Sequence, residues 1–148
     1  MTTIAYKNGI IAYDSRATNG AVITNPNANK CKTLNGASFF FCGAISDFDD
    51  FMALYFGEPV DKTLDVTAIV VEGSSVTLAS SDEEGKLWKE NLLEFPCYAI
   101  GSGATFALTA MDMGADAKKA VAMAAKRDTG TGGTIRTYKV QQQTKKKK

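Results

Sequence analysis

The sequence contains no histidine among its 148 residues. This absence excludes a Ser-His-Asp triad, a Cys-His pair, a histidine metal ligand and a histidine proton shuttle. Any acid–base chemistry must therefore use a lysine, a carboxylate, a tyrosine, a cysteine or the amine at the start of the chain.

Cysteine is scarce as well, with Cys31, Cys42 and Cys97 far apart in the chain. Three scattered thiols are too few for a disulfide framework or for a zinc site, which needs four ligands in close pairs. We therefore expect a reducing compartment, no metal and no cofactor. No window approaches the roughly 18 apolar residues of a membrane helix, and the start MTTIAYKNG lacks a signal segment, so we expect a cytoplasmic protein without membrane contact.

Charge is nearly balanced, with 17 basic and 16 acidic residues. Four of the basic residues are the lysines that end the chain, at 145–148, so the body itself is mildly acidic. The sequence predicts one domain over residues 1–140, followed by a polar, Lys-rich tail over 141–148. We interpret the tail as a solubilising end and expect no nucleic-acid partner.

The chain begins with a predicted β-hairpin. Two β-rich runs, residues 2–6 and 10–14, flank Asn8-Gly9, a pair that suits a type I′ turn. Counting outward from a two-residue turn pairs Asp14 with Thr3. This register brings a carboxylate beside the start of the chain.

A second predicted hairpin follows the same rule around Asn35-Gly36, with strands at residues 30–34 and 37–42. It sets Lys30 opposite Phe41, close to Gly43. The run FFFC within it is apolar on both faces, which is typical of a strand in a sheet that is covered on both sides.

Helical periodicity is found in three segments. An apolar stripe follows Ser46-x-x-Asp49, which would open a helix of about ten residues as a cap, and Ala- and Met-rich helices are predicted at 105–113 and 115–126. Further strands are predicted at 66–72, 76–80, 86–89, 97–100 and 134–140. This order of elements predicts an α+β sandwich.

Several short motifs occur together and in order. They are T-T-I at the start, I-A-Y-D-S-R-A-T at 11–18, Lys30 before Leu34, F-C-G at 41–43, A-I-G-S-G at 99–103 and R-D-T-G-T-G-G at 127–133. With this set the chain resembles the proteasome β-subunit family of N-terminal nucleophile hydrolases, and within that family it is most similar to the peptidase subunit of the bacterial two-component ATP-dependent protease. The resemblance implies a four-layer αββα sandwich, here trimmed because fewer than ten residues separate Gly57 from the strand predicted at 66–72, where relatives have a second long helix.

By this resemblance the nucleophile is Thr2 after removal of Met1, and the base is the α-amine of Thr2, whose reference pKa is about 7.7 to 8.0. Lys30 would stabilise the alkoxide, Asp14 would orient Lys30, and Gly43 would supply the N–H for the oxyanion. The residues expected to support the terminal amine, with the small residue packed beside them, are Ser102, Asp128, Thr131 and Gly132.

The resemblance implies a threonine-type peptidase that cuts unfolded or short peptides, in a homo-oligomeric ring with a possible ring ATPase unfoldase. An alternative is a catalytically silent relative that binds and modulates a partner protease. A weaker alternative is nucleotide binding at Gly101-Ser102-Gly103. Aromatic and leucine side chains are candidates to fill the gap of the missing helix or to form a contact surface: Trp88, Leu92, Leu93 and Phe95.

Overall fold

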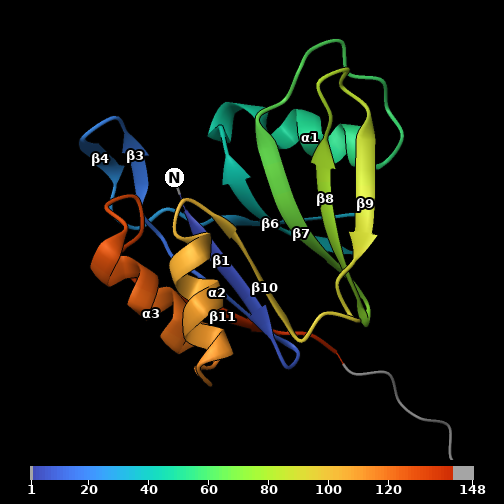
Figure 1. Cartoon of the computed structure of the whole chain (residues 1–148). Helices are drawn as coiled ribbons and strands as arrows, with labels where there is room; N and C mark the ends of the chain where they lie inside the picture. Colours follow the sequence, from blue (N-terminus) through green and yellow to red (C-terminus); the bar gives the residue numbers. More distant parts are fainter. Residues whose placement is uncertain (1, 142–148) are drawn as a thin grey trace, which may run out of the picture.

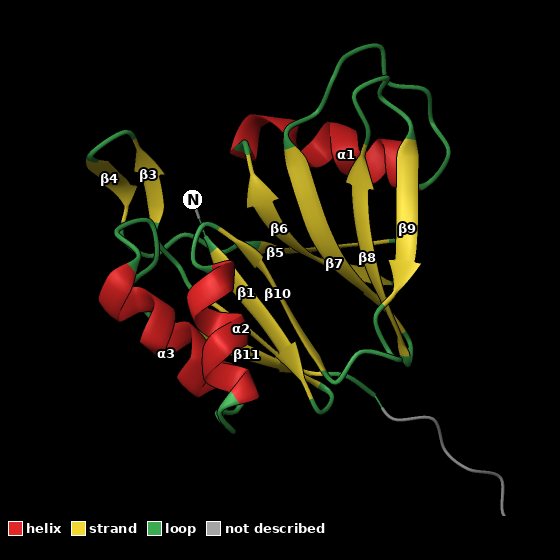
Figure 2. Ribbon diagram, in the orientation of Figure 1, coloured by secondary structure: helices red, strands yellow, loops and turns green. Residues whose placement is uncertain are grey.

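The computed structural model describes residues 2–141, so Met1 and all of the Lys-rich tail except Gln141 lie outside the described residues. Two antiparallel sheets pack face to face, and helices cover the outer face of each sheet (Figure 2). The layers are therefore helix, sheet, sheet and helices. This α+β arrangement confirms the predicted four-layer αββα sandwich.

The first sheet has the strand order β10-β1-β2-β11, with β1 (Thr3–Lys7) in its interior. The hairpin of β1 with β2 (Ile10–Tyr13) has the predicted register, and the backbone N–H of Asp14 donates to the Thr3 carbonyl over 3.2 Å. Its outer strands are β10 (Cys97–Gly101) and β11 (Arg136–Lys139).

The second sheet has the order β5-β6-β7-β8-β9. Its hairpin around Asn35-Gly36 also has the predicted register, because the N–H of Phe41 donates to the Lys30 carbonyl over 3.0 Å. The strands are β5 (Cys31–Leu34), β6 (Ala37–Gly43), β7 (Val66–Glu72), β8 (Ser75–Ser81) and β9 (Leu87–Asn91).

Consecutive phenylalanines of β6 enter different cores, as the run FFFC predicted. Phe40 lies between the two sheets with Tyr13 and Ile69. Phe39 and Phe41 face the opposite way and pack against α1 (Phe48–Tyr55). A strand with apolar residues on both faces is thus buried by both layers.

The other outer layer consists of α2 (Ala104–Asp112) and α3 (Ala117–Arg127), which lie side by side on the first sheet (Figure 1). Small side chains such as Ala5 and Ala12 on the sheet meet Ala120 and Ala124 on α3. This small-residue contact lets the helices lie close to the strands that carry the start of the chain.

One local expectation, the helix cap at Ser46, was wrong. Ser46 does not cap α1: a 3₁₀ turn, Ile45–Asp47, precedes that helix, and its N-cap, Asp47, makes no side-chain cap. The Asp47 carboxylate instead accepts from the backbone N–H of Asp65 and from Lys62. Ser46 cannot cap α1 because it lies inside that 3₁₀ turn, and the contacts of Asp47 keep its carboxylate from acting as the cap in its place.

A short ribbon, β3 (Ala17–Asn19) with β4 (Val22–Asn25), was not predicted from the sequence. It forms a separate two-stranded sheet beside the start of the chain (Figure 1). Every residue of β4 is exposed, so no buried alternation marks it as a strand.

The aromatic segment does not fill the place of the missing helix. Leu92 is buried between the sheets and Phe95 packs against that same core, whereas Trp88 and Leu93 are exposed. On the outer face of the second sheet, Lys89 instead lies over the Tyr55 ring, 3.9 Å from its centroid. Leu64, with the partly buried Val60 and Leu87, also packs against the apolar cluster on this face, so within residues 2–141 these side chains take the place of a second helix.

Candidate active site

Thr2 immediately precedes β1 and is only 4% exposed. The chain next to it is tightly packed, because Gly101 has φ +97° and a Cβ there would collide with the Thr2 carbonyl. Only glycine combines that left-handed conformation with this close approach. The start of β1 is thereby held against the end of β10.

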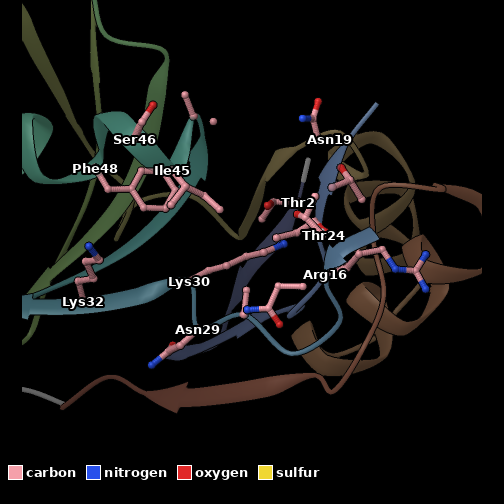
Figure 3. A pocket seen from close by; sticks show the side chains of 16 residues that line it. Thr2, Arg16, Asn19, Thr24, Asn29, Lys30, Lys32, Ile45, Ser46 and Phe48 are labelled. Carbon is pink, nitrogen blue, oxygen red and sulfur yellow. The ribbon is translucent and has the colours of Figure 1, made fainter. Parts of the chain in front are cut away.

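A buried ion pair lies beside Thr2. The Nζ of Lys30 donates to Oδ1 of Asp14 over 2.7 Å, and both side chains are almost completely buried. Burial lowers the pKa of Lys30, and the neighbouring Asp14 carboxylate partly offsets this effect. The ammonium of Lys30 points toward Thr2 (Figure 3).

Asp14 also accepts hydrogen bonds from the backbone. The Thr3 N–H donates to Oδ1 over 3.1 Å, and the Gly132 N–H donates to Oδ2 over 2.9 Å. Because a buried carboxylate needs several donors, these bonds fix its position. Asp14 thus joins the start of the chain, Lys30 and the 127–133 loop.

A second network starts at the backbone nitrogen of Thr2, which donates to Oγ of Ser102 over 3.2 Å. Ser102 donates in turn to Oδ2 of Asp128 over 2.6 Å. Since the Ser102 hydroxyl has one proton, its short bond to Asp128 leaves its oxygen free to accept from Thr2. The direction of donation runs from Thr2 to Ser102 to Asp128.

Thr131 joins the same carboxylate, because its hydroxyl donates to Oδ2 of Asp128 over 2.6 Å. The Thr3 hydroxyl lies 2.6 Å from that of Thr131, and Thr3 is the donor because the Thr131 proton is already used. Burial would raise the pKa of Asp128, but hydrogen bonds from Ser102, Thr131 and the Gly130 N–H outweigh it and hold that pKa below its usual value.

Gly43 ends β6 with φ +116°, and a Cβ there would collide with the Asp65 carbonyl. The N–H of Ala44 donates to that carbonyl over 2.7 Å, so Gly43 turns its own N–H to the opposite edge of β6. There Ala28, which would face Gly43, instead donates to Ser15 and accepts from Arg136. Within residues 2–141 no strand therefore pairs with this edge of Gly43.

Two cavities meet at Thr2. The larger one, about 750 Å³, also contains Lys30 and Gly43 in its wall, and it extends under the β3–β4 ribbon and past the start of α1 (Figure 3). The smaller one, about 330 Å³, is lined by Gly43 and Ser102, together with Thr2. Thr2 thus lies where an extended ligand could pass from one cavity to the other.

The seven predicted site residues are brought together. Two hydrogen-bond networks and the shared cavities connect Thr2, Asp14, Lys30, Gly43, Ser102, Asp128 and Thr131. Sequence reasoning missed Arg16, whose guanidinium lies where a Cβ on Gly132 would be and donates to the Thr129 carbonyl over 3.0 Å. Its place two residues after Asp14 was the available signal.

The glycines around Ser102 do not favour a phosphate site. Gly101 is required by the close approach of Thr2, and the Gly103 N–H donates to the Thr2 carbonyl over 3.4 Å. A Cβ on Gly103 would collide with the Thr3 hydroxyl. These residues serve the packing of β1.

Two other kinds of site are absent from the described residues. No helix within residues 2–141 is long and apolar enough to cross a bilayer. In the same part of the chain, no three Cys, Asp or Glu side chains gather where they could hold a metal ion.

Comparison with known proteins found similarity only among solved structures, since no protein-family model and no curated protein matches the chain. The structure of eukaryotic HslV from Trypanosoma brucei has a TM-score of 0.69 and 19% identity, covering 95% of this chain and 99% of that one. Thiobacillus denitrificans BPH in complex with epoxomicin gives 0.65 and 18%, covering 93% and 96%. Another structure of Thiobacillus denitrificans BPH gives 0.63 and 17%, covering 93% and 95%.

These likenesses extend over nearly the whole chain and establish its architecture. The fold is that of the N-terminal nucleophile hydrolases. The chain shares this fold with the structure of HslV. The sequence resemblance to the proteasome-related peptidases is thereby confirmed at the level of the fold.

Proposed function

We propose that the protein is a threonine-type peptidase that uses Thr2 as its nucleophile after removal of Met1 and cuts unfolded or short peptides. The observation that carries the proposal is the position of the Thr2 backbone nitrogen. Ser102 and Asp128 hold that nitrogen at a cavity that Thr2 shares with Lys30 and Gly43.

The proposed first step is attack of the Thr2 hydroxyl oxygen on the substrate carbonyl carbon. The α-amine of Thr2 takes the hydroxyl proton, because its reference pKa of about 7.7 to 8.0 leaves part of it unprotonated near neutral pH. The Thr2 nitrogen already donates to Ser102, so the same contact would orient the lone pair of the amine once Met1 is removed. The proton then passes to the departing amine, and water hydrolyses the resulting ester.

Lys30 and Gly43 are proposed to stabilise the negative charge of this reaction. The Lys30 ammonium favours the developing alkoxide, and the Gly43 N–H, which faces the cavity side of β6, donates to the oxyanion. Loss of one such donor in other hydrolases lowers kcat by about 10² to 10³. Asp14 acts through Lys30 as a positioning residue.

The likeness to HslV also supports proposals about assembly and location. We propose a homo-oligomeric ring in the cytoplasm, with an ATPase unfoldase as a possible partner. A silent relative that binds a partner protease is the second candidate, and the exposed side chains of Trp88 and Leu93 favour it. A silent protein, however, would not need the hydrogen-bond chain from Thr2 to Asp128.

The proposal is tested by peptide hydrolysis and intact mass. The purified full chain should lack Met1 and hydrolyse an unfolded protein or short fluorogenic peptides, and Thr2→Ala should abolish the hydrolysis. Thr137→Ala, at an exposed position of β11, is the matched control and should keep full activity. Retention of Met1, or hydrolysis that survives Thr2→Ala, would contradict the proposal.

A silent binder gives a different pattern. It would copurify with a related ring protein, and Thr2→Ala would not change that association.

Epoxomicin, which is bound in one BPH structure, is a suitable probe for a covalent or competitive effect on this chain.

A further inference from the structure

The larger cavity beside Thr2 is lined by cationic side chains without an acidic one. Among its sixteen lining residues are Arg16, Lys30 and Lys32, and none is an aspartate or a glutamate. A cleft lined by one sign of charge attracts ligands of the opposite sign. The lining therefore favours an anionic group on whatever enters this cavity.

Of the three cations, Lys32 is the best placed to pair with a ligand. Lys30 is held by the buried Asp14 carboxylate. The Arg16 guanidinium donates to the Thr129 carbonyl and points away from Thr2 (Figure 3). Lys32, by contrast, stands on the β5 wall with a half-exposed side chain.

The present partner of Lys32 is easily replaced. Its Nζ lies 3.0 Å from Oδ1 of Asp49, whose side chain is 81% exposed. Ion pairs between exposed groups contribute little stability, because water competes for both charges. Lys32 can therefore exchange Asp49 for a ligand carboxylate at small cost.

Two asparagines in the same wall add hydrogen-bond donors. The side-chain oxygen of Asn25 accepts from the Asn27 N–H over 2.9 Å, and that of Asn29 accepts from the Cys31 N–H over 3.0 Å. In each amide the oxygen is thus engaged, so the NH₂ group is the end left for a ligand. NH₂ groups complement a carboxylate, which only accepts.

We propose that this cavity binds an acidic side chain of the substrate and that Lys32 is the residue that determines this specificity. The inference rests on the proposed peptidase function, because Thr2 and Gly43 of the proposed active site also line this cavity. Substrates with an aspartate or glutamate close to the cut bond are then preferred over their neutral isosteres.

The test compares the binding of two capped tripeptides, each with two alanines and then either glutamate or glutamine, to the full chain carrying Thr2→Ala. This background prevents turnover, so binding is measured whether or not the native chain hydrolyses peptides. The glutamate peptide should bind with a Kd about fivefold lower than the glutamine peptide, the upper range for a partly exposed charge pair.

Lys32→Met should remove this difference, whereas Lys118→Met should keep it, because Lys118 is an exposed residue of α3 outside the cavity. Asp49→Asn should strengthen binding of the glutamate peptide about twofold, because Lys32 then has no competing carboxylate. Lys32→Glu should make the glutamate peptide bind more weakly than the glutamine peptide, and a third tripeptide that ends in lysine should then bind more tightly than either. Circular dichroism establishes that each variant is folded.

Equal binding of the two peptides, a preference that survives Lys32→Met, or no binding of the glutamate peptide at millimolar concentration would overturn the inference. Failure of the proposed function looks different. A charge preference in binding without any hydrolysis by the native chain removes the peptidase and leaves the acidic-ligand cavity. Hydrolysis by the native chain without a charge preference in binding removes the acidic-ligand cavity and leaves the peptidase.

Discussion

Two carboxylates flank the start of β1, and they occupy opposite kinds of surroundings. Asp14 is fully buried and neutralises the buried Lys30 ammonium. Asp128 is partly exposed and accepts from the hydroxyls of Ser102 and Thr131. One carboxylate thus balances a charge, and the other orients a chain of hydroxyl groups.

The difference predicts different costs of losing each charge. A buried cation without its partner is strongly destabilising, because neither water nor a counter-charge remains to stabilise it. Hydroxyl groups that lose a charged acceptor keep other partners and partial access to water. We therefore expect Asp14 to dominate stability and Asp128 to affect mainly the position of the Thr2 nitrogen.

The largest effect is expected for Asp14→Asn. The substitution leaves Lys30 charged and buried, and it turns an NH₂ group toward backbone N–H donors. The free energy of unfolding, measured by urea denaturation, should fall by about 3 to 5 kcal/mol.

The double variant Asp14→Asn/Lys30→Met separates the effect of the unpaired Lys30 charge from the effect of the changed side chain at position 14. It removes the unpaired cation, so part of the lost stability should return relative to Asp14→Asn alone. A double variant that is as unstable as the sum of the two single variants would contradict the view that charge balance is the main role of Asp14.

A smaller effect on stability is expected for Asp128→Asn. The amide retains one acceptor oxygen for Ser102 or Thr131, so the free energy of unfolding should fall by only about 1 kcal/mol. Peptide hydrolysis should fall more, by about 10²-fold, because the nitrogen of Thr2 loses its fixed orientation. Equal losses of stability in Asp14→Asn and Asp128→Asn would remove the contrast between the two sites.

Acid titration sharpens the same contrast. The hydrogen bonds from Ser102 and Thr131 hold the pKa of Asp128 below its unfolded value of about 3.9. The stabilisation from Asp128 is therefore present above about pH 4 and is lost as the pH falls through its lower, folded-state pKa. In urea titrations at pH 5, 4 and 3, the stability difference between the wild type and Asp128→Asn should shrink toward acid pH. A difference that grows toward pH 3 would contradict this sign.

The last prediction concerns the cysteines, which lie outside both networks and for which no change in stability or hydrolysis is expected. Burial raises the pKa of Cys31 and of Cys42 to about 11, although Cys42 lines the smaller cavity beside Thr2. At pH 7.5, alkylation by iodoacetamide should be slower than that of a free thiol by about two orders of magnitude. Rapid modification of Cys42 in the native protein would show that this cavity opens more than the structure indicates.

Much of the fold could be predicted because local signals agreed with tertiary packing. Asn8-Gly9 and Asn35-Gly36 specify tight turns, and these turns set the registers that carry Asp14 and Lys30 to their places. The β3–β4 ribbon could not be predicted, because its second strand has no buried face. The predicted cap of α1 at Ser46 was wrong because that residue lies in a 3₁₀ turn, which the contacts of Asp47 with Asp65 and Lys62 hold in place.

The grouping of the site residues came from a resemblance, and composition alone could not have provided it. Ser102 and Asp128 are 26 residues apart and meet only because α2 and α3 fold back on the first sheet. The hairpin registers predicted that Asp14 lies near Thr3 and Lys30 near Phe41. They do not specify how the two sheets stack, so they could not predict that Asp14 and Lys30 meet. The charge of the larger cavity was equally hidden, because its wall combines β3, β4, β5 and the start of α1.

The most direct test of the account is to locate the covalent adduct formed with an electrophile directed at N-terminal threonine. Intact mass followed by peptide mapping should place a single adduct on Thr2 of a chain that has lost Met1, and Thr2→Ala should prevent the adduct. An adduct on another residue, or an unmodified chain that retains Met1, would contradict the claim that the freed amine and hydroxyl of Thr2 form the reacting pair.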